Sequence, residues 1–196
     1  MLAGRLEAAA AGFTRSLALM EAAYGANHEY LMFPLIGLGQ VRSLEGEHEA
    51  ATRVFRRAVA VGEQTKSVNF PKALAGLAGE VEAADPAEAR RLVERAISAV
   101  EGEGEGGSML AGLLVRAGRL AVRTGDVAGA RGQLERALSV TTGRKEQVKE
   151  RGQAALELAR LTNETAQACA LLAEAKQADE TRVEAAALEA SRCEGQ

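Results

Sequence analysis

Residues 31–61 read LMFPLIGLGQVRSLEGEHEAATRVFRRAVAV, and the turn EGEH (45–48) separates two apolar-periodic segments within them. In the second segment Ala51, Phe55 and Ala58 recur at positions i, i+4 and i+7. This spacing places small, large and small apolar side chains on one face of a helix that packs closely on its neighbours. Gly46 suits the left-handed residue that ends a helix. The stretch therefore predicts two helices joined by a tight turn.

The same small–large–small pattern returns along the chain. Its last position is Ser16, Ala58, Ala96, Ala137 and Ala175, at steps of 42, 38, 41 and 38 residues. Three residues before the four alanines stand Phe55, Val93, Leu134 and Leu172, and seven residues before them stand Ala51, Ala89, Ala130 and Ala168. A near-fixed period of this kind predicts an array of stacked helix–turn–helix units.

The turns between the paired segments carry helix-ending and helix-starting residues. Gly125 is expected in the left-handed conformation, like Gly46. Asp85 and Pro86 suit the N-cap and the first turn of a helix. In the last turn, TNET (162–165), Asn163 replaces the glycine, and asparagine tolerates the left-handed conformation better than other residues do. We therefore expect Asn163 to end its helix as the glycines end theirs.

This pattern resembles the tetratricopeptide repeat family. The residues that carry the likeness in the second unit are Leu35, Leu38, Gly39, Gly46, Ala51, Phe55 and Ala58. The junction LALMEAAYGANHEYLMFPLIGLG (17–39) is similar to that of the longer, kinesin-light-chain-like variety found in bacterial signalling proteins, with Glu29 in place of a proline. The resemblance implies an all-α fold, a right-handed superhelical solenoid of antiparallel helix pairs.

The repeats predict the division of the chain. A partial unit covers about 1–27, and further units cover about 28–66, 67–101, 108–143 and 144–178. Residues 179–196 are expected to form a capping helix and tail, with Val183, Ala187 and Leu188 on the packed side. The segment GEGEGG (102–107) is expected to be a flexible acidic loop. Its formal G-x-G-x-x-G follows a helix rather than a strand, so it does not predict a phosphate site.

Composition excludes several classes of protein. The 196 residues include 41 Ala and 21 Gly but only 3% aromatics, which disfavours a β-sandwich. The net charge of -3 and the pI of about 5.6 argue against nucleic acid or an anionic membrane as an obligate partner. Arg5, Glu7 and Arg15 interrupt the apolar N-terminus, so it does not read as a signal peptide. A cytoplasmic location is the expectation.

Residues with catalytic or metal-binding chemistry are sparse. Cys169 and Cys193 read as two isolated thiols, the first as a small buried hydrophobic residue, and nothing requires an oxidising compartment. His28 reads as a structural histidine of its loop, and His48 is expected to pack its ring near the turn. No metal site, cofactor or catalytic constellation is indicated, and the chain is predicted not to be an enzyme.

The resemblance implies that the first helix of each unit lines a concave groove that binds a protein or peptide. The candidate groove residues are Gln40, Ser43, Lys72, Glu82, Arg116, Arg119, Arg123, Glu157 and Arg160. Arg116, Arg119 and Arg123 share one side of their helix and suit an acidic partner, although a solvated face is the simpler interpretation. The leading hypothesis is a non-enzymatic interaction scaffold without nucleic-acid or membrane partners.

One alternative remains open at this point. The chain begins in mid-repeat, which would also suit a regulatory or self-association segment of a larger bacterial signalling enzyme, such as a serine/threonine kinase, or of a transcription regulator. The sequence identifies neither the partner nor the oligomeric state.

Overall fold

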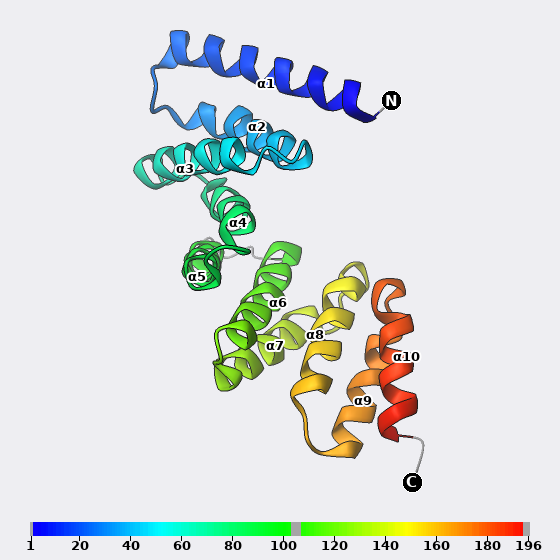
Figure 1. Cartoon of the computed structure of the whole chain (residues 1–196). Helices are drawn as coiled ribbons and strands as arrows, with labels where there is room; N and C mark the ends of the chain where they lie inside the picture. Colours follow the sequence, from blue (N-terminus) through cyan, green and yellow to red (C-terminus); the bar gives the residue numbers. More distant parts are fainter. Residues whose placement is uncertain (1, 103–106, 194–196) are drawn as a thin grey trace. The chain divides into compact units, whose positions relative to one another are not determined.

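The structure, a computed structural model, describes residues 2–102 and 107–193, and it is helical in both stretches (Figure 1). Neither stretch contains a β-strand. They correspond to two compact units, which we describe separately. The predicted all-α fold class is confirmed in both stretches. Of the segment 102–107, expected to be a flexible loop, residues 103–106 lie outside the described residues.

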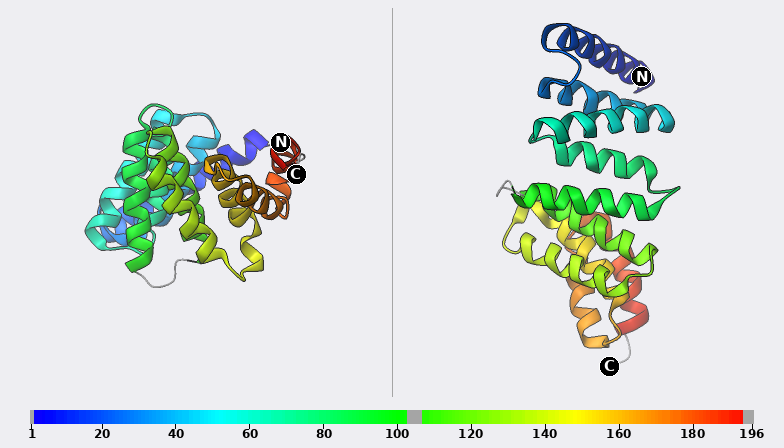
Figure 2. Two further views of the ribbon diagram at one scale, coloured as in Figure 1. Left: turned by 90° about the horizontal axis from the view of Figure 1, so that it is seen from below. Right: turned by 90° about the vertical axis from the view of Figure 1, so that its left-hand side faces the viewer.

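The first unit stacks its helices in chain order, each against the next (Figure 2). Its elements are α1 (Leu2–Tyr24), the short 3₁₀ helix η1 (Glu29–Leu31), α2 (Met32–Leu44), α3 (His48–Thr65), α4 (Phe70–Val81) and α5 (Pro86–Gly102). Helix α4 packs on both α3 and α2, so alternate helices also meet. This arrangement brings the first helices of successive pairs side by side.

The second unit follows the same scheme. Its elements are α6 (Gly107–Arg123), α7 (Val127–Thr141), the 3₁₀ helix η2 (Lys145–Gln147), α8 (Val148–Leu161), α9 (Thr165–Ala175) and α10 (Asp179–Cys193). Here α8 packs on α6, α7, α9 and α10. The unit boundaries expected from the repeats stay a prediction. No helix among residues 2–102 and 107–193 is long and apolar enough to cross a membrane.

The small–large–small face predicted for α3 is buried. Ala51 and Ala58 are fully buried, and the ring of Phe55 between them is 2% exposed. The ring lies against Gly39 of α2 and Gly76 of α4, where an added Cβ would stand 2.8 Å and 2.3 Å from it. These glycines are therefore required by close packing, since any side chain there would overlap the ring.

Several helix ends follow the expected capping chemistry. Gly46 and Gly125 have φ of +79° and +81°, as a left-handed helix end requires. The Asp85 carboxylate accepts a 2.8 Å hydrogen bond from the Glu88 amide at the start of α5. The expectation for Asn163 is wrong: it has no positive φ, and the turn is extended at Thr162 and Glu164 instead. An extended turn joins α8 to α9 without a left-handed residue.

The packed face of α10 differs from the one expected. Val183 is 82% exposed and Ala187 is also exposed, whereas Thr181 and Ala185 are buried and Leu188 is partly buried. The physical reason is a close approach at Gly152 of α8, where a Cβ would lie 2.6 Å from the Ala178 Cβ and 2.9 Å from the Thr181 Oγ1. Thr181 also donates a hydrogen bond to the Ala175 carbonyl, which fixes the rotation of α10.

The two cysteines form a disulfide, so the expectation of isolated thiols is wrong. Cys169 of α9 and Cys193 at the end of α10 have Cα atoms 6.0 Å apart. They are 24 residues apart in sequence, and only the antiparallel packing of α9 and α10 brings them together. The bond joins the end of α10 to the core cluster that includes Leu156, Leu172 and Ala185.

We expect Gly152→Ala to lower the free energy of unfolding by about 1–3 kcal/mol, because the added methyl group overlaps Ala178. Gly132→Ala is the matched control. Its Cβ would meet nothing within 4 Å, so the better helix propensity of alanine should raise stability by up to about 1 kcal/mol. Urea denaturation followed by circular dichroism measures both changes. Equal effects at the two positions would contradict the close approach of α8 and α10.

Candidate functional site

Two of the predicted groove residues line a pocket in the first unit. Gln40 and Ser43 lie on α2, and α4 provides the opposite wall. The pocket has a volume of about 380 Å³, and we call it the groove pocket. Its lining residues are Gln40, Ser43, Leu44, Phe55, Ala75, Gly76, Gly79 and Glu80. Leu44 at its rim is 71% exposed and gives the pocket an apolar edge.

The floor of the groove pocket is made of small residues for a structural reason. Gly76 must lack a side chain because the Phe55 ring lies beneath it. Ala75 and Gly79 continue this surface along α4. The consequence is that the backbone of another chain can approach α4 closely, while Gln40 and Ser43 offer hydrogen-bonding groups beside it.

Among the described residues that line the groove pocket, Glu80 alone has an ionisable side chain. That side chain is 5% exposed, and its Oε2 lies 2.9 Å from the His48 Nδ1. A buried carboxylate requires such a partner to offset the loss of hydration. The packing expected for His48 is wrong, because its side chain is 69% exposed and pairs with Glu80 from the start of α3.

The other predicted residues of the first unit lie elsewhere. Lys72, at the start of α4, donates a 3.2 Å hydrogen bond to the Asn69 Oδ1. Glu82 follows the end of α4 and has contacts of its own. Neither is among the residues that line the groove pocket. Glu80 and Leu44 were missed at the sequence level, although the two glycines at 76 and 79, one helical turn apart, are a signal that could have indicated the site.

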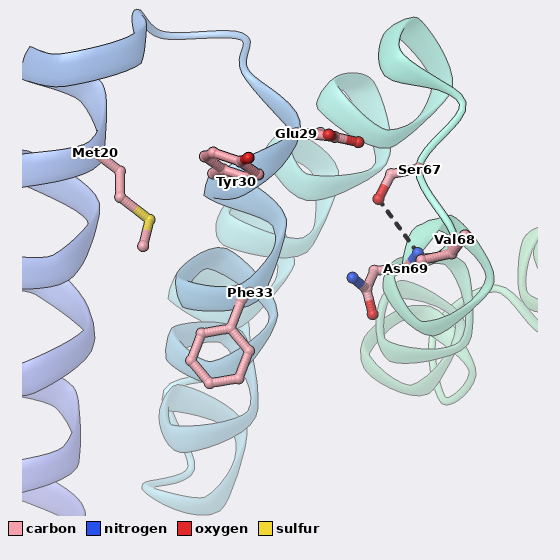
Figure 3. A pocket seen from close by; sticks show the side chains of 7 residues that line it. All are labelled: Met20, Glu29, Tyr30, Phe33, Ser67, Val68 and Asn69. Carbon is pink, nitrogen blue, oxygen red and sulfur yellow. Dashed lines mark hydrogen bonds between the residues drawn. The ribbon is translucent and has the colours of Figure 1, made fainter.

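A second pocket opens at the loop edge of the first unit, between α1, the start of α2 and the turn from α3 to α4 (Figure 3). Its volume is about 360 Å³, and we call it the edge pocket. Its lining residues are Met20, Glu29, Tyr30, Phe33, Ser67, Val68 and Asn69. None of them stood out as a site in the sequence, because the rings appeared there only as members of a repeat junction.

His28 shapes the loop beside the edge pocket. Its Nδ1 accepts a 3.2 Å hydrogen bond from the Tyr30 amide and so caps η1. Its ring also lies 4.6 Å from that of Tyr30 and 5.0 Å from that of Tyr24, measured between ring centroids. The structure therefore gives His28 a structural part in this loop.

In the second unit, three predicted residues join one chain of ion pairs. The Arg119 Nε lies 2.8 Å from the Glu157 Oε1, and the Arg160 Nη1 lies 3.0 Å from the Glu157 Oε2. Arg160 also pairs with Glu184, so the chain connects α6, α8 and α10. An acidic partner would therefore compete with Glu157 for Arg119. Arg116 and Arg123 have contacts too, and the three arginines do not form a free basic strip.

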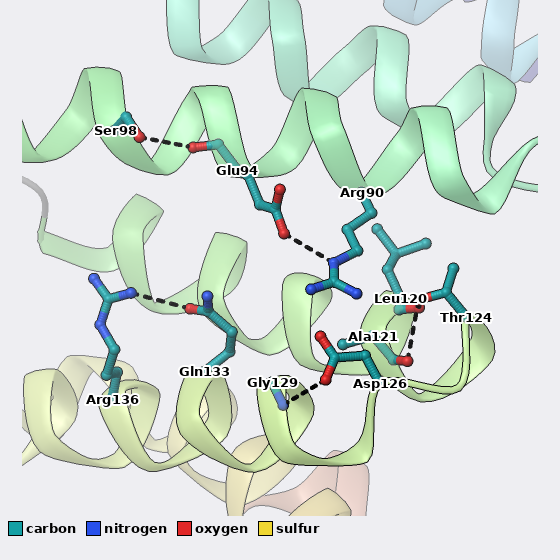
Figure 4. A network of polar contacts seen from close by, with 10 residues as sticks. All are labelled: Arg90, Glu94, Ser98, Leu120, Ala121, Thr124, Asp126, Gly129, Gln133 and Arg136. Atoms are coloured by element: carbon teal, nitrogen blue, oxygen red, sulfur yellow. Dashed lines mark hydrogen bonds and ion pairs between the residues drawn. The ribbon is translucent and has the colours of Figure 1, made fainter.

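Polar contacts also fix the end of α6, next to Arg123 (Figure 4). The Thr124 hydroxyl lies 3.0 Å and 3.1 Å from the carbonyl oxygens of Leu120 and Ala121. The Asp126 carboxylate caps α7 by accepting a 2.8 Å hydrogen bond from the Gly129 amide.

An ion pair also joins α8 to α10. The Glu180 carboxylate of α10 accepts a hydrogen bond from the Lys149 ammonium of α8 and raises the pKa of Lys149 above its usual range.

Within residues 2–102 and 107–193, no group of three or more His, Cys, Asp or Glu side chains gathers in a way that could hold a metal ion. The polar side chains that line the groove pocket are Gln40, Ser43 and Glu80, and Glu80 is paired with His48. What the two pockets offer is shape, apolar surface and a few hydrogen-bonding groups, which suits binding.

The comparisons agree with this geometry. The model of the tetratricopeptide repeat matches residues 1–64, which include α1, α2 and most of α3. Residues 1–64 belong to the tetratricopeptide repeat family. The family recognised from the sequence is confirmed, and similar helix pairs continue beyond the matched segment. The search of curated proteins found no match.

Solved structures show the fold over nearly the whole chain. BtubC (BKLC) from P. vanneervenii has a TM-score of 0.70 at 15% identity, over 89% of this chain and 74% of that one. A putative kinesin light chain with TPR-like repeats from Podosopora anserina has a TM-score of 0.68 at 18% identity, over 99% and 92%. YrrB, described as a TPR protein with an unusual peptide-binding site, has a TM-score of 0.62 at 18% identity, over 94% and 87%.

Proposed function

We propose that the chain is a non-enzymatic protein-interaction scaffold that binds an extended peptide segment in the groove pocket. The observation that carries the proposal is the pocket itself, where an exposed Leu44 and a glycine floor lie beside hydrogen-bonding side chains. Tetratricopeptide repeats mediate interactions between proteins, and the similar YrrB is described as having a peptide-binding site. Both points favour a peptide partner over a small-molecule substrate.

The chemistry of the pocket suggests how a peptide would bind. A peptide backbone on the Gly76–Gly79 surface would present amide and carbonyl groups to Gln40 and Ser43. An apolar side chain would cover Leu44, and Glu80 would accept from an N–H group of the ligand while it keeps its contact with His48. A partner of this kind gains affinity mainly from burying Leu44 and the exposed part of α4.

Gly79→Gln is expected to reduce partner binding at least about tenfold, because its side chain fills the groove pocket. Stability should rise slightly, since glutamine is a better helix former than glycine by up to about 1 kcal/mol. A photoreactive p-benzoyl-phenylalanine at Gln40 captures the partner for mass spectrometry, and the captured protein is then titrated against purified variants. Loss of binding with an unchanged melting curve is the expected result.

Gly132→Gln is the matched control, because Gly132 is an exposed helical glycine of α7 in the other unit. It should leave binding unchanged. Equal affinity of the Gly79→Gln and Gly132→Gln variants for the captured protein would contradict the groove pocket as the binding site. Turnover of a substrate by the purified chain would contradict the scaffold function.

A further inference from the structure

Three aromatic side chains of this chain, Tyr24, Tyr30 and Phe33, are half exposed or more. The chain has only 4 Phe and 2 Tyr, and four of these six lie at the junction of α1 and α2: Phe13, Tyr24, Tyr30 and Phe33. Phe33 is 68% exposed, and Tyr24 and Tyr30 are about half exposed. Neighbouring exposed rings form an apolar patch, and such patches on a protein surface commonly mark an interaction site.

The edge pocket is the hollow part of this surface, and its walls are held in place. Phe33 packs edge-on against Phe13 with ring centroids 5.9 Å apart, and Tyr30 packs edge-on against Tyr24 at 5.0 Å. On the opposite wall the Ser67 hydroxyl accepts a 3.3 Å hydrogen bond from the backbone N–H of Asn69, and Ser67 itself is buried. In Figure 3, Met20, Tyr30 and Phe33 lie on one side of the pocket, and Ser67, Val68 and Asn69 lie on the other. The pocket is therefore preformed, which lowers the entropic cost of binding.

The edge pocket has a carboxylate at its η1 wall, while the Lys72 ammonium is held by the Asn69 Oδ1 on the opposite wall. Glu29 is the one acidic or basic residue among its described lining residues, and its carboxylate makes no ion pair with any part of the chain that the structure describes. The ring of the adjacent Tyr30 is half exposed and offers a face to a cation. An acidic ligand would be repelled by Glu29. A cation on a long apolar stem matches both the carboxylate and the apolar surface of Met20, Phe33 and Val68.

We propose that the edge pocket binds an arginine side chain from a segment of a partner protein, with apolar residues beside the arginine. The planar guanidinium pairs with Glu29 in a bidentate manner and stacks on Tyr30, and its methylene groups lie on Phe33 and Val68. Lysine has the charge without the planar fork and binds more weakly. This site shares no residue with the groove pocket, so the inference goes beyond the proposed function and can fail or hold independently of it.

The test uses two synthetic probes, acetyl-Gly-Ser-Leu-Arg-Leu-Ser-Gly-amide and the same peptide with citrulline, which keeps the shape of arginine but has no charge. Binding to the full chain is followed by NMR titration of the Val68 methyl and Phe33 ring signals. The arginine peptide should bind about tenfold more tightly than the citrulline peptide, the difference expected for a hydrogen-bonded charge pair. Glu29→Gln should abolish that difference without changing the affinity for the citrulline peptide.

Phe33→Ala should weaken both peptides about tenfold, because it removes the apolar wall. Val183→Ala is the control, since Val183 is 82% exposed on α10 and lines neither the edge pocket nor the groove pocket. In parallel, a random heptapeptide library is selected on the wild-type chain and on the Phe33→Ala variant. Arginine flanked by apolar residues should be enriched only on the wild type. Equal affinities of the arginine and citrulline peptides would overturn the proposal. Selection of acidic peptides, or of the same peptides on the wild-type chain and on the Phe33→Ala variant, would also overturn it.

Discussion

Phe55→Ala is expected to lower the free energy of unfolding by about 3–5 kcal/mol, the range found for aromatic truncations in a core. The ring is 2% exposed and fills the space between α2, α3 and α4. Two of its neighbours are Gly39 and Gly76, which have no side chains that could move into the vacated volume. The cavity therefore stays open, and its cost adds to the lost transfer free energy of the ring.

Phe33→Ala is the matched control, because it removes the same ring from a site that is 68% exposed. It should change stability by less than about 1 kcal/mol. Guanidinium denaturation of the full chains, followed by circular dichroism, compares the two variants. The transition of Phe55→Ala should move to lower denaturant, while that of Phe33→Ala should stay close to the transition of the unsubstituted chain. A loss below about 1 kcal/mol for Phe55→Ala would contradict its packing against the two glycines.

Reduction of the Cys169–Cys193 disulfide is expected to lower the stability of the second unit by about 3 kcal/mol. The bond closes a loop over 24 residues that contains the turn from α9 to α10, so breaking it increases the entropy of the unfolded chain. Helix α10 should loosen first, because its packed face depends on Ala185, Leu188 and the tethered Cys193.

Hydrogen exchange measured by mass spectrometry, with and without a phosphine reductant, tests this expectation. Amides of α9 and α10 should exchange faster after reduction, and those of α1–α5 should not change. The variant with Cys169→Ser and Cys193→Ser should behave like the reduced chain and ignore the reductant. Free thiols in the unreduced protein after denaturation, or equal exchange of α10 in both states, would contradict the bond as a stabilising element.

Sequence reasoning was sufficient for the features that local chemistry determines. The positive φ of Gly46 and Gly125, the cap at Asp85 and the burial of Ala51, Phe55 and Ala58 all follow from short-range spacing. Features that depend on packing between helices could not be predicted from the sequence. The disulfide and the rotation of α10 depend on how α10 meets α8 and α9, and no local pattern encodes that contact.

The candidate site was predicted only in part for the same reason. Gln40 and Ser43 line the groove pocket, opposite residues of α4. Their positions along one helix were enough to predict that they lie on this side. Arg119, Glu157 and Arg160 were each predicted as groove candidates, whereas the ion pairs that connect them arise from the stacking of α6, α8 and α10. The edge pocket combines residues from three separate segments, so only the folded chain reveals it.

The contact of Phe55 with Gly39 and Gly76 has a consequence for how this sequence can diverge. Neither glycine can gain a methyl group while the ring is present, and the ring cannot be lost without leaving a hole. A substitution on one helix becomes tolerable only after a compensating one on another. Among descendants of this chain, the three positions should therefore change together, and a lineage with a smaller residue at Phe55 would be free to carry alanine in the facing helices.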